Sequence, residues 1–302
     1  MKNSIPFKLA AFFRAFSRPE ASIHPAGAHA PAKIAPPFQA RPPASAIFRW
    51  LAVGAGALLA AVLCIQPALA QETLVPADSA SRWGLGLGVG VERKPYRGMD
   101  NDTQALPLLF YENKWVSLMG SRLDIKLPSA GPVSFGLRAR YAAEGYEASD
   151  SPVFAGMAER KDGLWLGAAA VWRNDIATVS AELLGDASGN SKGQQARLLV
   201  ERGFKSGAFE FVPRVAATWL DSKYVGYYYG VNASEATAGR AAYAGKASVN
   251  LELGLRTSYA LAPRQSVFVD LSVMGLGSGI KDSPLVERSS QSTLRVGYLY
   301  RF

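Results

Sequence analysis

One stretch of the chain alternates polar and apolar side chains without a break over fifteen residues. Between 246 and 260, Lys246, Glu252 and Arg256 belong to one parity, and the other parity carries no charge. Such a period of two predicts a β-strand with one apolar and one polar face. Shorter alternating segments occupy 132–142, 175–184, 194–203, 208–219, 265–274 and 292–302. The run 164–173 is apolar on both parities, so alternation does not determine its facing.

The length of these segments distinguishes between two kinds of β-protein. They span about 9 to 15 residues, whereas a strand in a soluble protein usually has about 5 or 6 and a tilted membrane-spanning strand roughly 9 to 11. In a transmembrane barrel the lipid-facing parity is apolar, and the inward parity is polar, charged or glycine. The stretch 83–91 (WGLGLGVGV), with glycine at every second position, suits such a wall. A soluble β-sandwich or lipocalin-like barrel also alternates, but it turns the apolar parity inward.

Aromatic residues at strand ends favour the membrane interpretation, because outer-membrane barrels carry aromatic girdles at both interfaces. These residues are Trp83, Tyr111, Trp115, Tyr141, Trp172, Trp219 and Tyr259. We therefore predict an all-β fold: a transmembrane antiparallel up-and-down β-barrel of about 12 strands that follows an N-terminal signal peptide. Such a protein would lie in the lipid of the cell outer membrane.

The connections give the strand count. Long loops at 94–104, 142–163, 220–245 and 277–290, with a medium one at 185–193, alternate with short turns near 112–114, 128–131, 174, 204–207 and 261–264. If both termini are periplasmic, the number of strands is even. The alternation of loops and turns then requires 114–127 to reverse direction once, around Gly120 and Ser121, which gives twelve strands. Ten strands is the alternative.

The beginning of the chain has the features of a secretion signal. Arg49 precedes the apolar run 51–65, and Pro67 follows it. Small residues then stand at the positions that a signal peptidase inspects. The predicted cleavage site is Ala68, Ala70 and Gln71, with cleavage before Gln71. An uncleaved membrane helix is the alternative, but an apolar run of about 15 residues is short for a bilayer that needs roughly 20.

The chain accordingly divides into three parts. Residues 1–46 are an extended signal region or upstream sequence included in the reading frame, 47–70 are the signal core and cleavage site, and 71–302 are the outer-membrane barrel domain. Charge agrees with this division: the formal net charge is +9, but seven Lys/Arg and one acid lie before residue 71, which leaves 26 basic and 23 acidic residues. The basic excess belongs mainly to the leader, so no nucleic-acid partner is predicted.

Cleavage would also remove every imidazole and thiol. His24, His29 and Cys64 all lie before residue 71, and the sequence holds no other histidine or cysteine. A Ser-His-Asp triad, a Cys-His pair and any His or Cys metal site are then excluded. Proton transfer at neutral pH usually depends on a group with a pKa near 7. We therefore predict a protein that is not an enzyme, with no catalytic residue, metal or cofactor.

The final strand resembles the C-terminal assembly signal of bacterial outer-membrane barrels. That signal has a polar residue, a glycine two positions later, and aromatic residues at the third-last and last places. The corresponding residues are Arg295, Gly297, Tyr300 and Phe302. The resemblance implies that the barrel assembly machinery is a partner, whereas the alternative is an ordinary strand that ends a sheet.

Loop 220–245 holds the candidate contact residues. They are Tyr224, Tyr227, Tyr228, Tyr229, Arg240 and Tyr243. Tyrosine is enriched in protein interfaces because its ring packs while its hydroxyl hydrogen-bonds. The alternative is a loop that folds over the barrel mouth by its own aromatic packing.

Several segments together resemble the MipA/OmpV family of outer-membrane proteins. They are SKYVGYYYGVNASEATAGRAAY (222–243), LELGLRTSYAL (251–261), IKDSPLVER (280–288), YRGMD, LPLLFYENKW and the terminal GYLYRF. The resemblance covers roughly 82–302. It implies an outer-membrane barrel whose namesake is a scaffold between a membrane-bound lytic transglycosylase and a bifunctional murein synthase, and hence a role in peptidoglycan biosynthesis in a Gram-negative cell envelope. Other members are treated as porin-like or adhesive proteins, and the family supplies no catalytic residue.

The inward parity leaves the scaffold and channel interpretations open. It carries Arg138, Arg140, Glu182, Arg197, Glu201, Glu210, Arg214, Glu252, Arg256 and Asp270. Mixed charges suit internal ion pairs as well as a wet pore. Twelve strands lie between small filled barrels and open 16-stranded porins, so size does not decide. The predicted function is a scaffold that links the outer membrane to murein-synthesising and murein-cleaving enzymes, and the alternative is a small porin-like channel or adhesin.

Overall fold

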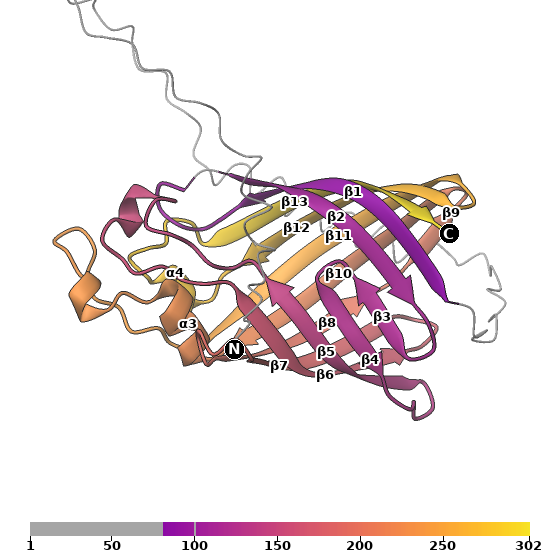
Figure 1. Cartoon of the computed structure of the whole chain (residues 1–302), viewed down its shortest axis with the longest axis horizontal. Coiled ribbons are helices and arrows are strands. Elements are labelled where there is room, and N and C mark those ends of the chain that lie inside the picture. Colours follow the sequence, from indigo (N-terminus) through magenta and orange to yellow (C-terminus); the bar gives the residue numbers. More distant parts are fainter. Residues whose placement is uncertain (1–80, 100) are drawn as a thin grey trace, which may run out of the picture. The chain divides into compact units, whose positions relative to one another are not determined.

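The alternating segments form one closed antiparallel sheet in the computed structural model, which describes residues 81–99 and 101–302 (Figure 1). The strands are β1 (Arg82–Arg93), β2 (Asp102–Glu112), β3 (Val116–Met119), β4 (Arg122–Lys126), β5 (Val133–Ala142), β6 (Gly163–Arg173), β7 (Thr178–Asp186), β8 (Gln194–Glu201), β9 (Phe204–Ser206), β10 (Phe209–Leu220), β11 (Ser248–Ala262), β12 (Gln265–Gly275) and β13 (Ser290–Arg301). The signal cleavage site at Ala68, Ala70 and Gln71 lies outside the described residues.

The sheet closes where β13, the last strand, pairs with β1, and every other neighbouring pair, including β10 with β11, follows the order of the chain. The short β9 lies in line with β8, because both pair with β10 along one edge. The wall therefore has twelve strands, as the loop pattern predicts, and the ten-strand alternative is wrong. The expected reversal at Gly120 and Ser121 joins β3 to β4, and Gly120 has a φ of +58° that this tight turn requires.

Several boundaries differ from the prediction; for example, the strand expected at 175–184 is Thr178–Asp186, and β2 begins at Asp102, within the loop expected at 94–104. β11 begins at Ser248, so Lys246 belongs to the preceding loop and not to the wall. The turn expected at 204–207 begins later, because Phe204 to Ser206 continue beside β10. The chain reverses at Gly207, whose φ of +59° is favourable only for glycine.

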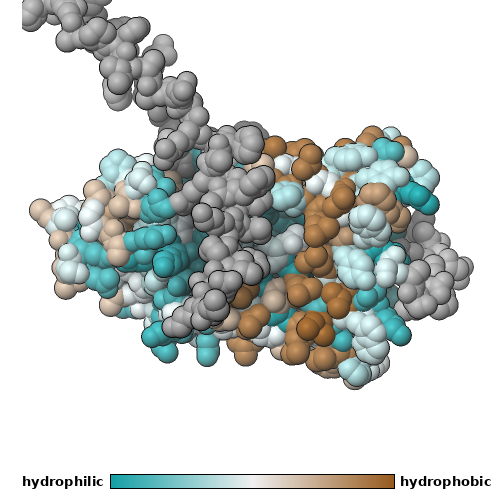
Figure 2. Space-filling model, viewed as in Figure 1, coloured by the Kyte–Doolittle hydropathy of each residue, from teal (hydrophilic) through white to brown (hydrophobic). Residues whose placement is uncertain are grey.

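Large apolar side chains cover the outside of the barrel. Leu87, Leu251 and Leu253 are 74%, 62% and 51% exposed, and the two leucines of β11 lie on the parity opposite to Glu252 and Arg256. The ambiguous segment β6 follows the same rule: Leu164 and Leu166 face outward, whereas Trp165 is fully buried on the inside. Figure 2 shows the resulting apolar band between the polar loop end and the opposite end. This distribution is the one a membrane barrel requires, and it excludes the soluble barrel.

The glycines of β1 form a bare inner strip. A Cβ atom on Gly86 would lie 2.0 Å from the carbonyl oxygen of Tyr298, so no larger residue fits the observed backbone. On the adjoining strand, a Cβ on Gly297 would lie 2.7 Å from the Phe268 ring and 3.0 Å from Leu108. Side chains of the neighbouring strands therefore cover the backbone of these glycines, which have no side chains.

The β3–β4 hairpin is much shorter than its neighbours. Gly120 N donates to Leu109 O at 2.9 Å, and β2 pairs with β3 only from Phe110 to Glu112. Within the described residues, the part of β2 before Leu109 therefore has a strand partner on one side only, namely β1. Pro107, which lacks an N–H, occupies this free edge, as is usual for a proline in a sheet.

The long loops gather at one end of the barrel (Figure 1). They contain the helices α3 (Ser222–Tyr229) and α4 (Ser278–Lys281) and the 3₁₀ turns η1 (Pro152–Phe154) and η2 (Ala233–Glu235). Over the described residues, none of the helices has the length and apolar character to cross a membrane. Both described chain ends and the short turns lie at the opposite end, which in such barrels faces the periplasm.

Candidate functional site

The loops pack on one another as a cap with a hydrophobic core. The core joins Tyr96, Tyr146 and Phe154 to α3 and also includes Ile280 and Leu285. Inward-facing side chains at the loop ends of three strands belong to the same cluster: Trp165, Leu184 and Leu220. The cap therefore lies against the inner wall of the mouth.

Helix α3 is built from the tyrosine-rich segment. Asp221 is its N-cap, and its carboxylate accepts the N–H of Tyr224 at 2.8 Å. Tyr224 and Tyr228 are buried, and Tyr229 stacks on Tyr96 with ring centroids 5.4 Å apart. Burial raises the pKa of the Tyr224 hydroxyl well above its usual range, so this phenol stays neutral.

The remaining candidate contact residues also make internal contacts. The Tyr227 hydroxyl accepts the Lys161 N–H at 2.8 Å, and the Tyr243 hydroxyl donates to Gly279 O at 2.9 Å. Arg240 is buried and donates to Glu235 O, to the carbonyl of Val153 in η1 and to that of Ala155, which follows η1. The six residues thus lie as in the alternative of a loop that folds over the barrel mouth by its own packing. Contact of these residues with a partner protein stays a prediction.

A buried ion pair fixes the cap. Arg160 Nη2 lies 2.8 Å from Glu235 Oε2, and each side chain is 6% exposed. Burial alone would raise the pKa of Glu235, but hydrogen bonds from Arg160 and from the N–H groups of Asn232 and Ala158 lower it to about 2. Sequence reasoning missed this pair. The available signal was the Asn-x-x-Glu spacing of Asn232 and Glu235, which forms a capping box.

Glu144 occupies the boundary between cap and lumen. Burial raises the pKa of its carboxyl to about 7, although Arg140 and a hydrogen bond with Tyr224 act in the opposite direction. Its Oε2 is buried and has no hydrogen-bond partner among the described residues. The side chain therefore titrates near neutral pH beneath α3.

Two networks of ion pairs line the lumen. In the first, Arg138 Nε and Nη2 donate to Asp124 at 2.7 and 3.0 Å, and its Nη1 donates to Glu182 on β7. Arg140 Nη1 donates to the other oxygen of Glu182 at 3.3 Å. The network therefore runs along the wall from β4 to β7.

The second network joins β8 to β12. Arg214 donates to both oxygens of Asp270, at 2.8 and 2.9 Å, and to Glu252 at 3.0 Å. Arg197 reaches the second oxygen of Glu252 at 2.8 Å, and Arg256 donates to Asp270 at 3.1 Å. The guanidinium of Arg214 crosses β11 where Gly254 leaves room for it, since a Cβ there would lie 2.6 Å from Arg214 Cζ.

The C-terminal strand closes the barrel at the turn end. Phe302 N donates to Trp83 O at 2.9 Å, and the two rings stack with centroids 4.0 Å apart. Tyr300 packs edge-on against Phe302, while Gly297 lies beneath Phe268. Arg295 faces the lumen and is exposed there. The four residues of the predicted assembly signal thus all lie in or directly after the strand that closes the barrel. Their recognition by an assembly machinery stays a prediction.

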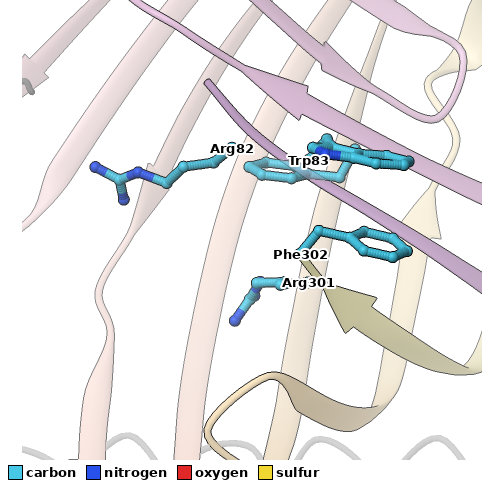
Figure 3. A pocket seen from close by; sticks show the side chains of 5 residues that line it. Arg82, Trp83, Arg301 and Phe302 are labelled. Carbon is cyan, nitrogen blue, oxygen red and sulfur yellow. The ribbon is translucent and has the colours of Figure 1, made fainter. Parts of the chain in front are cut away.

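Beside this seam lies a pocket of about 290 Å³. It is lined by Arg82, Trp83, Phe110, Arg301 and Phe302. Figure 3 shows Trp83 and Phe302 side by side, with Arg82 and Arg301 extending away from them in a common direction. Sequence reasoning did not identify this pocket. In the part of the chain that the structure describes, no three His, Cys, Asp or Glu side chains are grouped so as to hold a metal ion.

Comparison with protein families identifies the barrel. Residues 85–302 match the family model described as MltA-interacting protein MipA. The chain belongs to this family. It is therefore an outer-membrane β-barrel of the MipA/OmpV type, as the sequence resemblance implies.

Individual members of the MipA family are distant relatives of this chain. The putative outer membrane protein YiaT of Escherichia coli K12 is 24% identical over 227 residues, which cover 74% of this chain and 92% of YiaT. The MltA-interacting protein of the same organism is 26% identical over 231 residues, 75% of this chain and 92% of the relative. The outer membrane protein Omp26La of Vibrio anguillarum is 29% identical over 157 residues, 52% and 61% of the two chains.

Among solved structures, an outer membrane channel from Pseudomonas putida F1 is similar to this MipA-family barrel with a TM-score of 0.41. The match is 12% identical and covers 79% of this chain and all of the channel.

Proposed function

We propose that this barrel is a non-enzymatic interaction protein that links the outer membrane to enzymes that cleave and synthesise murein. The partners are a lytic transglycosylase and a bifunctional murein synthase. Membership of the MipA family and the name of the MltA-interacting relative support the transglycosylase. The synthase follows from the family resemblance alone.

The cap is the observation that favours an interaction protein over an open pore. Its core packs on inward-facing Trp165, Leu184 and Leu220, and the Arg160–Glu235 pair holds its loops together. Such packing occupies the outer mouth with side chains. The turn end, which faces the periplasm, is then the surface available to murein enzymes.

Capture from cell envelopes tests this proposal. The full chain, tagged in a cap loop and cross-linked in intact cells, should recover a lytic transglycosylase together with a murein synthase. An unrelated outer-membrane barrel carrying the same tag is the control. Recovery of neither enzyme, or equal recovery by the control, contradicts the scaffold.

A small porin-like channel is the second candidate. It is favoured by lumen side chains that keep contact with solvent, such as Arg256, whose side chain is 46% exposed although it faces inward. Planar-bilayer recording separates the two candidates. A capped barrel gives no steady conductance, whereas steady steps from the purified wild-type protein establish the channel.

A further inference from the structure

The inner half of the turn-end pocket combines arginine with one phenylalanine, and its outer half is aromatic. Gly84 pairs with Arg301 on one side and with Phe110 on the other, so these three residues form one row that faces the lumen. Arg82 lies two positions earlier on the same face. Trp83 and Phe302 belong to the outward parity and form the stacked rim. Arginine and phenylalanine thus face each other across bare glycine backbone.

Gly84 keeps the floor of this pocket open. A Cβ atom at this position would lie 2.6 Å from the Tyr300 carbonyl oxygen and 3.5 Å from Arg301 Cγ. The observed pairing of β1 with β13 therefore requires a residue without a side chain. The space between Arg301 and Phe110 is a consequence of that requirement.

Neither of the two arginines is paired with an acidic side chain of the described residues. Neither guanidinium has a hydrogen bond or ion pair to another described residue. The acid opposite Arg82 in the sheet is Glu112, but its Oε1 already accepts from Lys126 Nζ at 2.7 Å. A further arginine adjoins the site, because Arg301 N donates to the carbonyl of Arg264 at 2.8 Å. The deep lumen differs in that Arg138 and Arg214 each bond two acids.

We propose that this pocket anchors a carboxylate-bearing segment of a periplasmic protein. Arginine binds carboxylates through two parallel hydrogen bonds, which gives both strength and orientation. An apolar side chain next to the carboxylate packs on Phe110, which faces the lumen beside Arg301. The volume of about 290 Å³ is at the lower limit of ligand pockets, so it takes one or two side chains of an extended segment. This inference rests on the proposed function, since it gives the chemistry by which a periplasmic partner is held.

The facing of the arginines favours a peptide over a lipid headgroup. Arg82 and Arg301 lie on the lumen side of the wall, whereas Trp83 and Phe302 lie on the lipid side. A phospholipid phosphate approaches from the lipid side and meets the stacked rings first. A peptide that enters from the periplasmic mouth meets both guanidinium groups directly.

Peptide binding to the purified full-length barrel in detergent tests the proposal. The probe is a fluorescent peptide that contains Glu-Glu-Phe, and its control contains Gln-Gln-Phe. We expect binding of the acidic peptide at least tenfold tighter than that of the amide peptide, with affinity that falls as salt rises. The double variant Arg82→Gln/Arg301→Gln should lose at least tenfold in affinity. Arg93→Gln, an exposed arginine at the other end of β1, is the matched control and should bind as wild type does.

Further variants keep the test informative if the double variant assembles poorly. Heat-modifiable gel mobility reports assembly of every variant. Phe110→Ala should weaken binding of the phenylalanine-containing peptide but not binding of a Glu-Glu-Gly analogue. A general loss of folding would weaken the binding of both. Equal binding of acidic and amide peptides, or unchanged binding by the folded double variant, overturns the proposal. Full displacement of the bound peptide by inorganic phosphate, or by phosphatidylglycerol micelles at equal charge, also overturns the proposal. The proposal is likewise overturned if an N-terminal segment of this chain fills the site and blocks binding of the probe.

The same variants separate this inference from the proposed function. Envelope capture with Arg82→Gln/Arg301→Gln should recover less murein enzyme than wild type. If the peptide binds but wild type recovers no murein enzyme, the pocket is supported and the scaffold is contradicted. If the double variant recovers the enzymes as wild type does, the scaffold is supported and the role of the pocket is overturned.

Discussion

Arg160 and Glu235 form an ion pair inside the cap, 75 residues apart in the chain and almost wholly shielded from water. Arg160 also donates to the carbonyls of Tyr227 and Ala158, at 2.7 and 2.8 Å, so its guanidinium joins α3 to the loop after β5. Each charge depends on the other, because a buried charge without a partner is costly.

Loss of Glu235 should loosen the cap without unfolding the barrel. Glu235→Ala leaves the guanidinium of Arg160 buried and unpaired, at a cost of about 3 to 5 kcal/mol. We expect rapid proteolysis within 221–247 while heat-modifiable mobility is kept. Glu159→Gln, at an exposed acid next to Arg160, is the control and should resist the protease as wild type does. Equal protease resistance of both variants would contradict a structural role for the pair.

The cap should weaken as pH rises from about 4.5 to 7. Glu144 has a pKa of about 7 in the folded protein, above the ordinary glutamate value of 4.5. Between these values the folded cap holds a proton that the opened cap releases, so the stability of the cap falls with increasing pH. The melting temperature of the near-ultraviolet circular dichroism signal should decrease across this window. Glu144→Gln should remove the decrease, and a variant that retains it would show that another group is responsible.

Strong acid should weaken the cap through a different group. Glu235 has a pKa of about 2 in the folded protein, below the ordinary glutamate value of 4.5. The opened cap therefore binds a proton before the closed one does, and stability is lost as pH falls from about 4.5 to 2. In the Glu235→Gln variant, the melting temperature of the cap should no longer fall between about pH 4.5 and 2; we call this fall the acid limb. The acid limb of Glu144→Gln should match that of wild type.

Breaking the second lumen network should destabilise the barrel itself. Asp270 is 1% exposed and holds both Arg214 and Arg256. Asp270→Asn should cost about 3 to 5 kcal/mol, because it leaves Arg214 without its bidentate partner. Arg256→Gln, at a largely hydrated side chain, should cost about 1 kcal/mol or less. Urea unfolding in lipid vesicles, followed by tryptophan fluorescence, measures both, and equal costs would count against a buried network.

The facing of β11 can be tested with a pair of arginine substitutions. Leu253→Arg places a charge on the lipid side near the middle of the wall and should cost about 2 to 4 kcal/mol. Ser258→Arg faces the lumen and should be nearly neutral. The same unfolding assay compares them, and an equal loss from both would mean that the two sides of the strand meet similar surroundings.

The wall could be predicted from sequence because its physics is local and periodic. Alternation fixes which side of each strand is apolar, and the lipid makes a slip of one residue costly. Even the short hairpin at Gly120 follows from the alternation of loops with turns. The family resemblance, carried by the tyrosine loop and the last strand, is confirmed by the match over 85–302.

The cap and the pocket are less accessible to such reasoning. Tyrosines in a loop serve contact and packing equally well, and only the positions of Tyr96, Phe154 and Trp165 around α3 distinguish the two. The pocket joins positions 82, 110 and 301, which come together only after the sheet closes. No local period connects such distant residues.

Because the β3–β4 hairpin is shorter than its neighbours, the apolar band does not have the same height all around the barrel. On that flank the hydrogen-bonded backbone stops at Gly120, which bonds to Leu109, so the part of β2 from Asp102 to Leu108 extends beyond the hairpin toward the loop end. Lipid cannot satisfy exposed amide groups, so the surrounding leaflet must dip there or the whole cylinder must lean. We therefore expect the bilayer to be thinnest, or the barrel to tilt, on the side that carries the hairpin.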